Sequence, residues 1–137
     1  MNDRRRTPRS EDDIVAGPGG ELALQTIAMP KDANYHGDIF GGWLLSQMDL
    51  AGAVLARRVA HGRVATVAVD SMVFLRPVPV GSVVSCYARL LNIGRSSMQI
   101  MVEVWVGDEP ATQQKVTEGK FTFVAIDEQG RTRAVQA

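Results

Sequence analysis

The sequence predicts an α+β domain in which one long central helix is wrapped by a five-stranded antiparallel sheet. One strand-like run precedes a single helix-like segment of about 20 residues, four strand-like runs follow it, and short turns join those four runs. Parallel strands need long crossover connections, so short turns favour antiparallel pairing. A helix of about 20 residues is about 30 Å long, which is enough to cover one face of such a sheet.

The expected helix follows a loop over residues 30–39 and ends at His61 and Gly62, with Gly62 as the expected C-terminal cap. At helical spacing one stripe is apolar: Leu44, Met48, Ala51, Leu55 and Val59. Small residues on the helix would allow close approach to a sheet: Ala51, Gly52, Ala53 and Ala56. The mostly polar side also carries apolar residues, which we expect a partner subunit to cover: Trp43, Leu50 and Val54.

The expected strands span residues 22–29, 64–75, 83–93, 98–106 and 114–126. The run over 98–106 alternates between apolar and other residues, as a strand with one buried face does. The run over 64–75 is apolar on both faces, which predicts a central strand. Cys86, the one cysteine, lies in an apolar run and is predicted to be a buried, inert thiol.

The composition indicates one domain of 137 residues, with a flexible tail over 1–20 and a single folded domain over 21–137. Fifteen basic and fifteen acidic residues cancel, so there is no broad electrostatic footprint for nucleic acid. The sequence contains no membrane-length apolar run, no secretory-signal pattern and no cluster that calls for a metal or another cofactor. We therefore expect a cytoplasmic protein.

A candidate active site lies in the loop that leads into the helix, where residues 34–43 read NYHGDIFGGW. Asp38 could activate a water molecule as general base or attack a carbonyl carbon as nucleophile. The amides of Phe40, Gly41 and Gly42 would be unpaired at a helix start and suited to an oxyanion hole. The alternative is that Asp38 caps the helix, since aspartate is favoured near a helix start.

Polar residues near this loop are supporting candidates. Asn34 could hold the loop in an Asx-type turn or line the site. His36 could orient Asp38, or it could be a solvated loop residue. On the helix, Gln47 and Asp49 are expected to be polar interface groups, with Asp49 as a second candidate acid.

A second candidate region is the turn formed by Gly94, Arg95, Ser96 and Ser97 between two expected strands. The guanidinium group of arginine suits phosphate because its donors form a fork. Spacing alone favours an ordinary strand turn, and this alternative stays open.

Four segments of the chain resemble the YciA-type acyl-CoA thioesterases of the hotdog-fold superfamily, which are related to the cytosolic brain acyl-CoA hydrolases. These segments read NYHGDIFGGWLLSQMDLAGA, HGRVATVAVDSMVF, NIGRSSMQIMVEVWV and KFTFVAID. The resemblance covers roughly residues 22–133. Two positions depart from the usual pattern, Ser82 and Lys120, and both lie outside the acid-containing loop.

The resemblance implies hydrolysis of acyl-CoA to a free carboxylic acid and CoA, an activity of fatty acid metabolism. It implies that Asp38 is the catalytic residue and that CoA contacts fall partly on residues 94–97. It also implies an active site at a dimer interface and a homohexamer built as a trimer of dimers. No cofactor is implied.

Two other functions fit the same fold. An acyl-thioester hydratase or dehydratase would use a histidine with an acid, but the two-residue offset of His36 from Asp38 does not resemble that arrangement. A non-enzymatic acyl-CoA-binding protein is the third alternative, and an acid retained in the motif argues against it.

Overall fold

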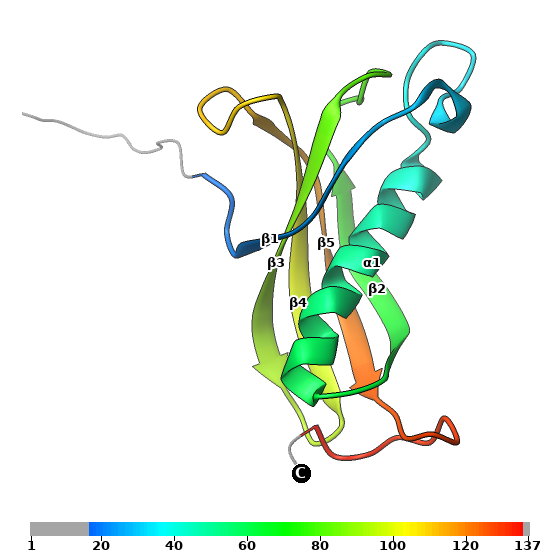
Figure 1. Ribbon diagram of the computed structural model, residues 1–137, viewed down its shortest axis with the longest axis vertical. Helices are drawn as coiled ribbons and strands as arrows, with labels where there is room; N and C mark the ends of the chain where they lie inside the picture. Colours follow the sequence, from blue (N-terminus) through cyan, green and yellow to red (C-terminus); the bar gives the residue numbers. More distant parts are fainter. Residues whose placement is uncertain (1–16, 136–137) are drawn as a thin grey trace, which may run out of the picture.

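The computed structural model describes residues 17–135, so residues 1–16 of the expected flexible tail lie outside the described residues. The chain forms β1 (Glu21–Ile27), a short 3-10 helix η1 (Pro30–Asp32), α1 (Gly41–Ala60), β2 (Val64–Phe74), β3 (Val83–Ile93), β4 (Ser97–Val106) and β5 (Gln114–Ala125) (Figure 1). The prediction of one long helix and five strands is confirmed. No helix within residues 17–135 is long and apolar enough to cross a membrane.

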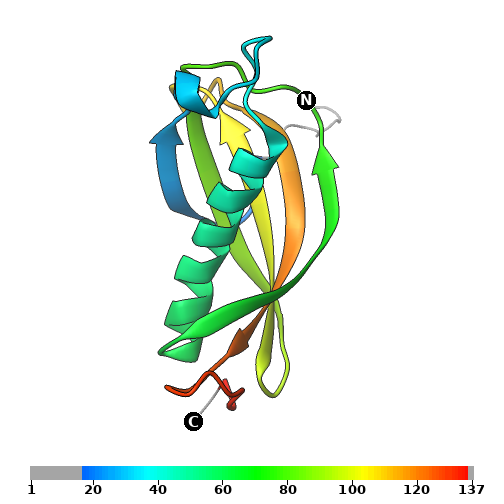
Figure 2. The same cartoon turned by 90° about the vertical axis from the view of Figure 1, so that its right-hand side faces the viewer.

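The five strands form one antiparallel sheet in the order β1-β3-β4-β5-β2. The sheet curves around α1, as the predicted hotdog architecture requires (Figure 2). The prediction that residues 64–75 form a central strand is wrong, because β2 lies at an edge of the sheet. Its apolar residues are exposed in the protomer, with Val67 at 57% and Val73 at 43%. An edge strand that is apolar on both faces is suited to pairing with another chain.

The core lies between α1 and the inner face of the sheet. The buried side of α1 consists of Leu44, Met48, Ala51, Gly52, Leu55, Ala56 and Ala60. A Cβ atom added to Gly52 would lie 2.9 Å from the Phe123 ring on β5. The expected close approach of small helix residues to the sheet is therefore confirmed. Val59, expected on the apolar stripe, is only partly buried.

The end of α1 differs from the prediction. His61, with φ of 55°, takes the left-handed conformation that was expected of Gly62. The lack of a side chain at Gly62 leaves room for Arg133, since a Cβ atom at Gly62 would lie 2.7 Å from Nη2 of Arg133. The same nitrogen donates a 2.9 Å hydrogen bond to the carbonyl oxygen of Ala60. A residue from the C-terminal segment thus satisfies one of the unpaired carbonyl groups at the helix end.

The expected burial of Cys86 is confirmed. Burial raises the pKa of its thiol from 9.0 to about 12, because removing the charged thiolate from water is costly. The group therefore stays protonated at neutral pH and belongs to the core.

We expect Gly52→Val to lower the free energy of unfolding by about 1–3 kcal/mol, because the added side chain would clash with the Phe123 ring in a packed core. Urea denaturation at a fixed protomer concentration measures the change. The matched control is Gly42→Val on the same helix, where nothing lies within 4 Å of an added Cβ atom. Equal losses in the two variants would contradict the role assigned to Gly52.

Candidate active site

The loop before α1 is held in shape by Asn34. Its side-chain oxygen accepts hydrogen bonds from the amides of His36 (2.9 Å) and Asp38 (3.2 Å). Gly37 lies between these residues with φ of 87°, which glycine adopts without strain. The Asx-type turn that was one alternative for Asn34 is therefore present.

Asp38 is half-buried, and its main chain forms a bridge with Pro79. The residue that caps α1 is Phe40, and no side chain makes a capping hydrogen bond. The alternative that Asp38 caps the helix is therefore wrong. Within residues 17–135 no hydrogen bond or ion pair to the Asp38 carboxylate is formed, so the group has no partner among the described side chains.

The helix start offers two amides for an oxyanion, where the sequence suggested three. The amide of Phe40 donates to the carbonyl oxygen of Asp32 at 3.1 Å and is unavailable. The amides of Gly41 and Gly42 open the helix and have no acceptor within the described part of the chain. The helix dipole favours negative charge at this position.

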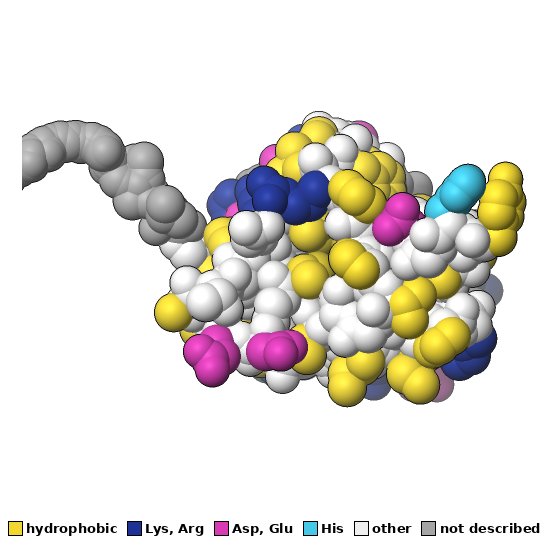
Figure 3. Space-filling model, turned by 90° about the horizontal axis from the view of Figure 1, so that it is seen from above, with side chains coloured by type: hydrophobic (Ala, Val, Ile, Leu, Met, Phe, Trp, Pro, Cys, Tyr) yellow, Lys and Arg dark blue, Asp and Glu magenta, His cyan; other side chains and the backbone are white. Residues whose placement is uncertain are grey.

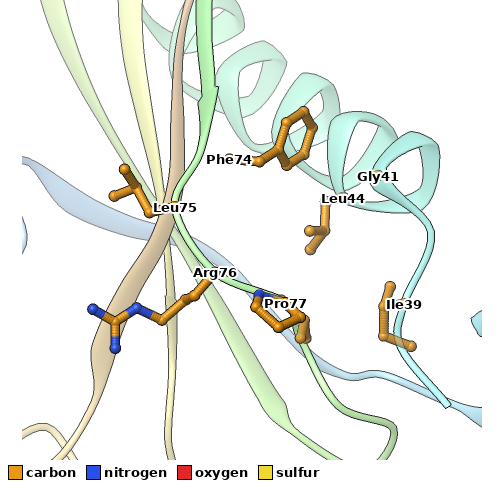
Figure 4. A pocket seen from close by; sticks show the side chains of 8 residues that line it. Ile39, Gly41, Leu44, Phe74, Leu75, Arg76 and Pro77 are labelled. Atoms are coloured by element: carbon orange, nitrogen blue, oxygen red, sulfur yellow. The ribbon is translucent and has the colours of Figure 1, made fainter. Parts of the chain in front are cut away.

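Two hollows lie beside this helix start. The first, of about 420 Å³, we call the Phe74 hollow; it is lined by Ile39, Gly41, Leu44, Phe74, Leu75, Arg76, Pro77 and Val78 (Figure 4). The second, of about 280 Å³, we call the Asp49 hollow; it is lined by Gly42, Leu45, Ser46, Asp49, Thr66, Val69 and Phe121. Asp38 lines neither hollow. Figure 3 views this end of the molecule and shows several hydrophobic side chains exposed on it.

Asp49 makes the most specific polar contact in these hollows. The hydroxyl group of Thr66 on β2 donates a 2.6 Å hydrogen bond to Oδ1 of Asp49 on α1. Asp49 is half-buried and shares its hollow with Gly42. From the sequence, Asp49 was only a second candidate acid, because its partner Thr66 lies on a different element and no local pattern links the two residues.

The structure does not bring His36 to the Asp38 carboxylate. The His36 side chain is exposed, and its ring centroid lies 4.4 Å from that of Tyr35. Tyr35 is 94% exposed, so this aromatic pair projects from the loop. The solvated alternative for His36 is the one that the single protomer displays.

The turn over residues 94–97 lies at the opposite end of the sheet from the loop (Figure 1). Its main chain is held by hydrogen bonds of 2.8 Å from the amide of Ala125 to Ser96 and from that of Val135 to Arg95. The same C-terminal segment contacts the end of α1 through Arg133. A 20-residue helix is about 30 Å long. One protomer therefore does not bring residues 94–97 close to Asp38, Gly41 and Gly42.

Known proteins with similar sequences are thioesterases. The sequence model of the thioesterase superfamily matches residues 36–112. The acyl-CoA thioester hydrolase YciA of Escherichia coli (strain K12) is 56% identical over 122 residues, which cover 86% of this chain and 92% of that protein.

Solved structures agree with the sequence matches. HI0827, described as a hexameric broad specificity acyl-coenzyme A thioesterase, has 52% identity and a TM-score of 0.82, covering 89% of this chain and 85% of that chain. An acyl-CoA hydrolase from Staphylococcus aureus has 29% identity and a TM-score of 0.76, covering 81% of this chain and 68% of that chain. Structures of three alanine variants of that enzyme are known. In that enzyme's own numbering, the replaced residues are an asparagine at position 28, an aspartate at position 43 and a threonine at position 60.

Fold, site and comparisons together define a hotdog-fold thioesterase. The chain belongs to the YciA family of acyl-CoA thioester hydrolases. Its activity is the hydrolysis of acyl-CoA thioesters, as the sequence resemblance implied. The relatives are hydrolases, so they give no support to the hydratase and non-enzymatic alternatives.

Proposed function

We propose that acyl-CoA hydrolysis takes place between the start of α1 and β2, with Asp49 as the catalytic carboxylate. One observation carries this proposal: the Asp49 carboxylate accepts a 2.6 Å hydrogen bond from Thr66 and lines a hollow between α1 and β2. A carboxylate and oxyanion donors are the two elements that thioester hydrolysis needs. Asp38, which the sequence resemblance favoured, remains the second candidate.

Residue spacing supports the same proposal. The variants of the Staphylococcus aureus hydrolase fall at an asparagine, an aspartate and a threonine in positions 28, 43 and 60. The same residue types recur with the same separations here, at Asn34, Asp49 and Thr66. Two of the three are hydrogen-bonded to each other in this structure. We infer that the three residues serve one reaction in this protein as well.

In the proposed reaction, the thioester carbonyl oxygen accepts hydrogen bonds from the amides of Gly41 and Gly42 of a second protomer, because Asp49 lies seven residues, about 10 Å, further along its own helix. The Asp49 carboxylate takes a proton from water, whose oxygen attacks the carbonyl carbon. The tetrahedral intermediate collapses, the C–S bond breaks, and the CoA thiolate leaves and is protonated. Alternatively, the carboxylate attacks the carbonyl carbon directly, the C–S bond breaks and the CoA thiolate leaves and is protonated, and water then hydrolyses the mixed anhydride between the acyl group and Asp49. In both routes the Thr66 hydroxyl group orients the carboxylate.

We expect Asp49→Asn to lower kcat by at least about 100-fold, because the amide cannot act as base or nucleophile. The asparagine side chain still has an oxygen that can accept from Thr66, so the fold should be retained. Release of free thiol from butyryl-CoA measures the rate. Asp38→Asn is the comparison and should keep more activity. The opposite order, with Asp38→Asn inactive and Asp49→Asn active, would transfer the catalytic role to Asp38.

The turn over residues 94–97 is proposed to bind the phosphate groups of CoA, as the family resemblance implies. Arg95 is exposed, and its side chain makes no hydrogen bond or ion pair within residues 17–135. This turn lies at the far end of the protomer from the Asp49 hollow. A CoA molecule whose thioester lies at the Asp49 hollow of one protomer would therefore contact the turn of another protomer. Likewise Asn34 does not line the Asp49 hollow of its own chain. The asparagine that serves a given Asp49 would therefore come from a second chain.

Arg95→Ala is expected to raise KM for acyl-CoA roughly tenfold with little change in kcat, because Arg95 would hold CoA away from the reacting carbon. Steady-state kinetics with butyryl-CoA measures both constants. Arg131→Ala is the matched control, since Arg131 is another exposed arginine and lies at the same end of the molecule as Arg95. A KM equal to that of the control would remove Arg95 from the CoA site.

We propose that the protein assembles as a trimer of dimers, with β2 as the edge along which two protomers pair. The relatives HI0827 and the thioesterase of Yersinia pestis are described as hexameric. In this chain β2 is an apolar edge strand, and Leu50 on the neighbouring helix is 55% exposed. Pairing would satisfy the backbone groups of the edge and cover these side chains. The cytoplasmic location expected from the sequence stays a prediction.

Val67→Lys should dissociate the assembly, because a charged side chain on an edge strand opposes pairing with another strand. Sedimentation velocity measures the mass of the wild-type and variant proteins. Lys31→Ala, on the exposed 3-10 helix, serves as a control that should leave the mass unchanged. A hexamer that survives Val67→Lys would show that another surface forms the main contact.

A further inference from the structure

We propose that Arg133 positions the turn over residues 94–97 for CoA binding, by holding the C-terminal strap against this turn. We define the C-terminal strap as residues 126–135, which follow β5 at the end of the molecule where α1 ends (Figure 1). The inference rests on the proposed role of Arg95 in binding the phosphate groups of CoA. It names a residue that supports this role without touching the substrate.

The Arg133 side chain joins three parts of the main chain. Nη2 donates a 2.9 Å hydrogen bond to the carbonyl oxygen of Ala60, the last residue of α1. Nε donates to the carbonyl oxygen of Ile126 at 3.1 Å, and Nη1 donates to that of Ala134 at 3.2 Å. The planar guanidinium group has donors enough for several acceptors, and its positive charge suits the carbonyl end of a helix. Arg133 therefore fastens both ends of the strap to α1.

The strap in turn holds the main chain of the turn. The amide of Val135 donates a 2.8 Å hydrogen bond to the carbonyl oxygen of Arg95, and the amide of Ala125 donates one of 2.8 Å to that of Ser96. Val135 is 2% exposed and belongs to the core, which fixes this end of the strap. The amide of Arg133 also donates a 2.9 Å hydrogen bond to the carbonyl oxygen of Ala125. The turn is thus held by β5 on one side and by the strap on the other.

Anchoring of the main chain matters for Arg95 because its side chain makes no hydrogen bond or ion pair in the described part of the chain. A mobile turn would lose main-chain freedom as well as side-chain freedom on binding a phosphate group. A turn that is already held loses only the side-chain part, and such preorganisation raises affinity. Loosening the strap should therefore weaken the binding of CoA.

The strap also lies beside space that a ligand of the turn could occupy. A hollow of about 380 Å³ is lined by Ile93, Gly94, Arg95 and Ala134. Ala134 is the strap residue whose carbonyl oxygen accepts from Arg133. The side chain of Arg133 thus holds a wall of this hollow as well as the main chain of the turn.

A second arginine at this end of the molecule provides a matched control. Nη1 of Arg63 donates hydrogen bonds to the carbonyl oxygens of Asp127 at 3.2 Å and Glu128 at 3.0 Å. Within the described chain these two strap residues make no main-chain hydrogen bond to residues 94–97. Arg63→Ala should therefore loosen the strap without releasing the turn.

The test compares two thioesters as substrates of the full-length protein: butyryl-CoA, and butyryl-N-acetylcysteamine, which lacks the nucleotide and phosphate groups of CoA. Arg133→Ala should raise KM for butyryl-CoA about fivefold with little change in kcat, because the turn would lie away from the reacting carbon. The same variant should leave kcat/KM for butyryl-N-acetylcysteamine within about twofold of the wild-type value. Arg63→Ala should change neither substrate's constants.

Two further variants make the test specific. Arg133→Lys keeps the positive charge at the helix end but offers one nitrogen for three carbonyl groups, so it should also raise KM for butyryl-CoA. It keeps the test decisive if Arg133→Ala does not fold. Adding Arg133→Ala to Arg95→Ala should raise KM little beyond Arg95→Ala alone, because both changes affect one contact and are not additive.

Equal losses on the two thioesters, or multiplied losses in the double variant, would overturn the proposal and make Arg133 a purely structural residue. An unchanged KM for butyryl-CoA in Arg133→Ala and Arg133→Lys, with a raised KM in Arg95→Ala, would also overturn it. Failure of the proposed CoA site would be seen separately, as an unchanged KM in Arg95→Ala itself.

Discussion

The close approach of α1 to the inner face of the sheet is the constraint on which the rest of the structure depends. Gly52 faces the Phe123 ring with no room for a side chain, and α1 contacts all five strands. This contact sets how deeply the helix lies in the curved sheet. It also aligns the start of α1 with the end of β2, so that the Phe74 ring lies beside Gly41 and Thr66 donates a hydrogen bond to Asp49. The crevice between helix and edge strand is therefore a consequence of core packing.

Within that crevice, two consecutive glycines serve two purposes. The loop before the helix uses the Phe40 amide to hold Asp32, which leaves the amides of Gly41 and Gly42 as the unpaired donors at the helix start in the described chain. Because neither glycine carries a side chain, a hollow remains next to each. Unpaired amides at the helix start and a carboxylate in a nearby hollow suit a substrate with a reactive carbonyl group.

A single protomer contains only part of this arrangement. Residues 94–97 lie at the end of α1 opposite to the helix start, tied there by Ala125 and Val135. The edge strand β2 and Leu50 on α1 present apolar surface that is exposed in the protomer. Apolar surface at a sheet edge is covered in stable proteins by another chain. Oligomerisation and substrate binding would thus use the same side of the molecule.

The sequence by itself determined the elements of this protein and its family. Hydrophobic periodicity depends on neighbours a few residues apart, so the helix and the five strands could be predicted with bounds within two residues of those observed. The two glycines at the helix start carry a local signal for the same reason. Only the tertiary structure decided the rest. In the structure, β2 lies at the edge of the sheet. The residue in the left-handed conformation is His61 instead of Gly62, and Asp38 does not cap the helix. The tertiary structure also joined Asp49 to Thr66, because contacts between residues on different elements follow from how a helix packs on a sheet, which no local pattern specifies.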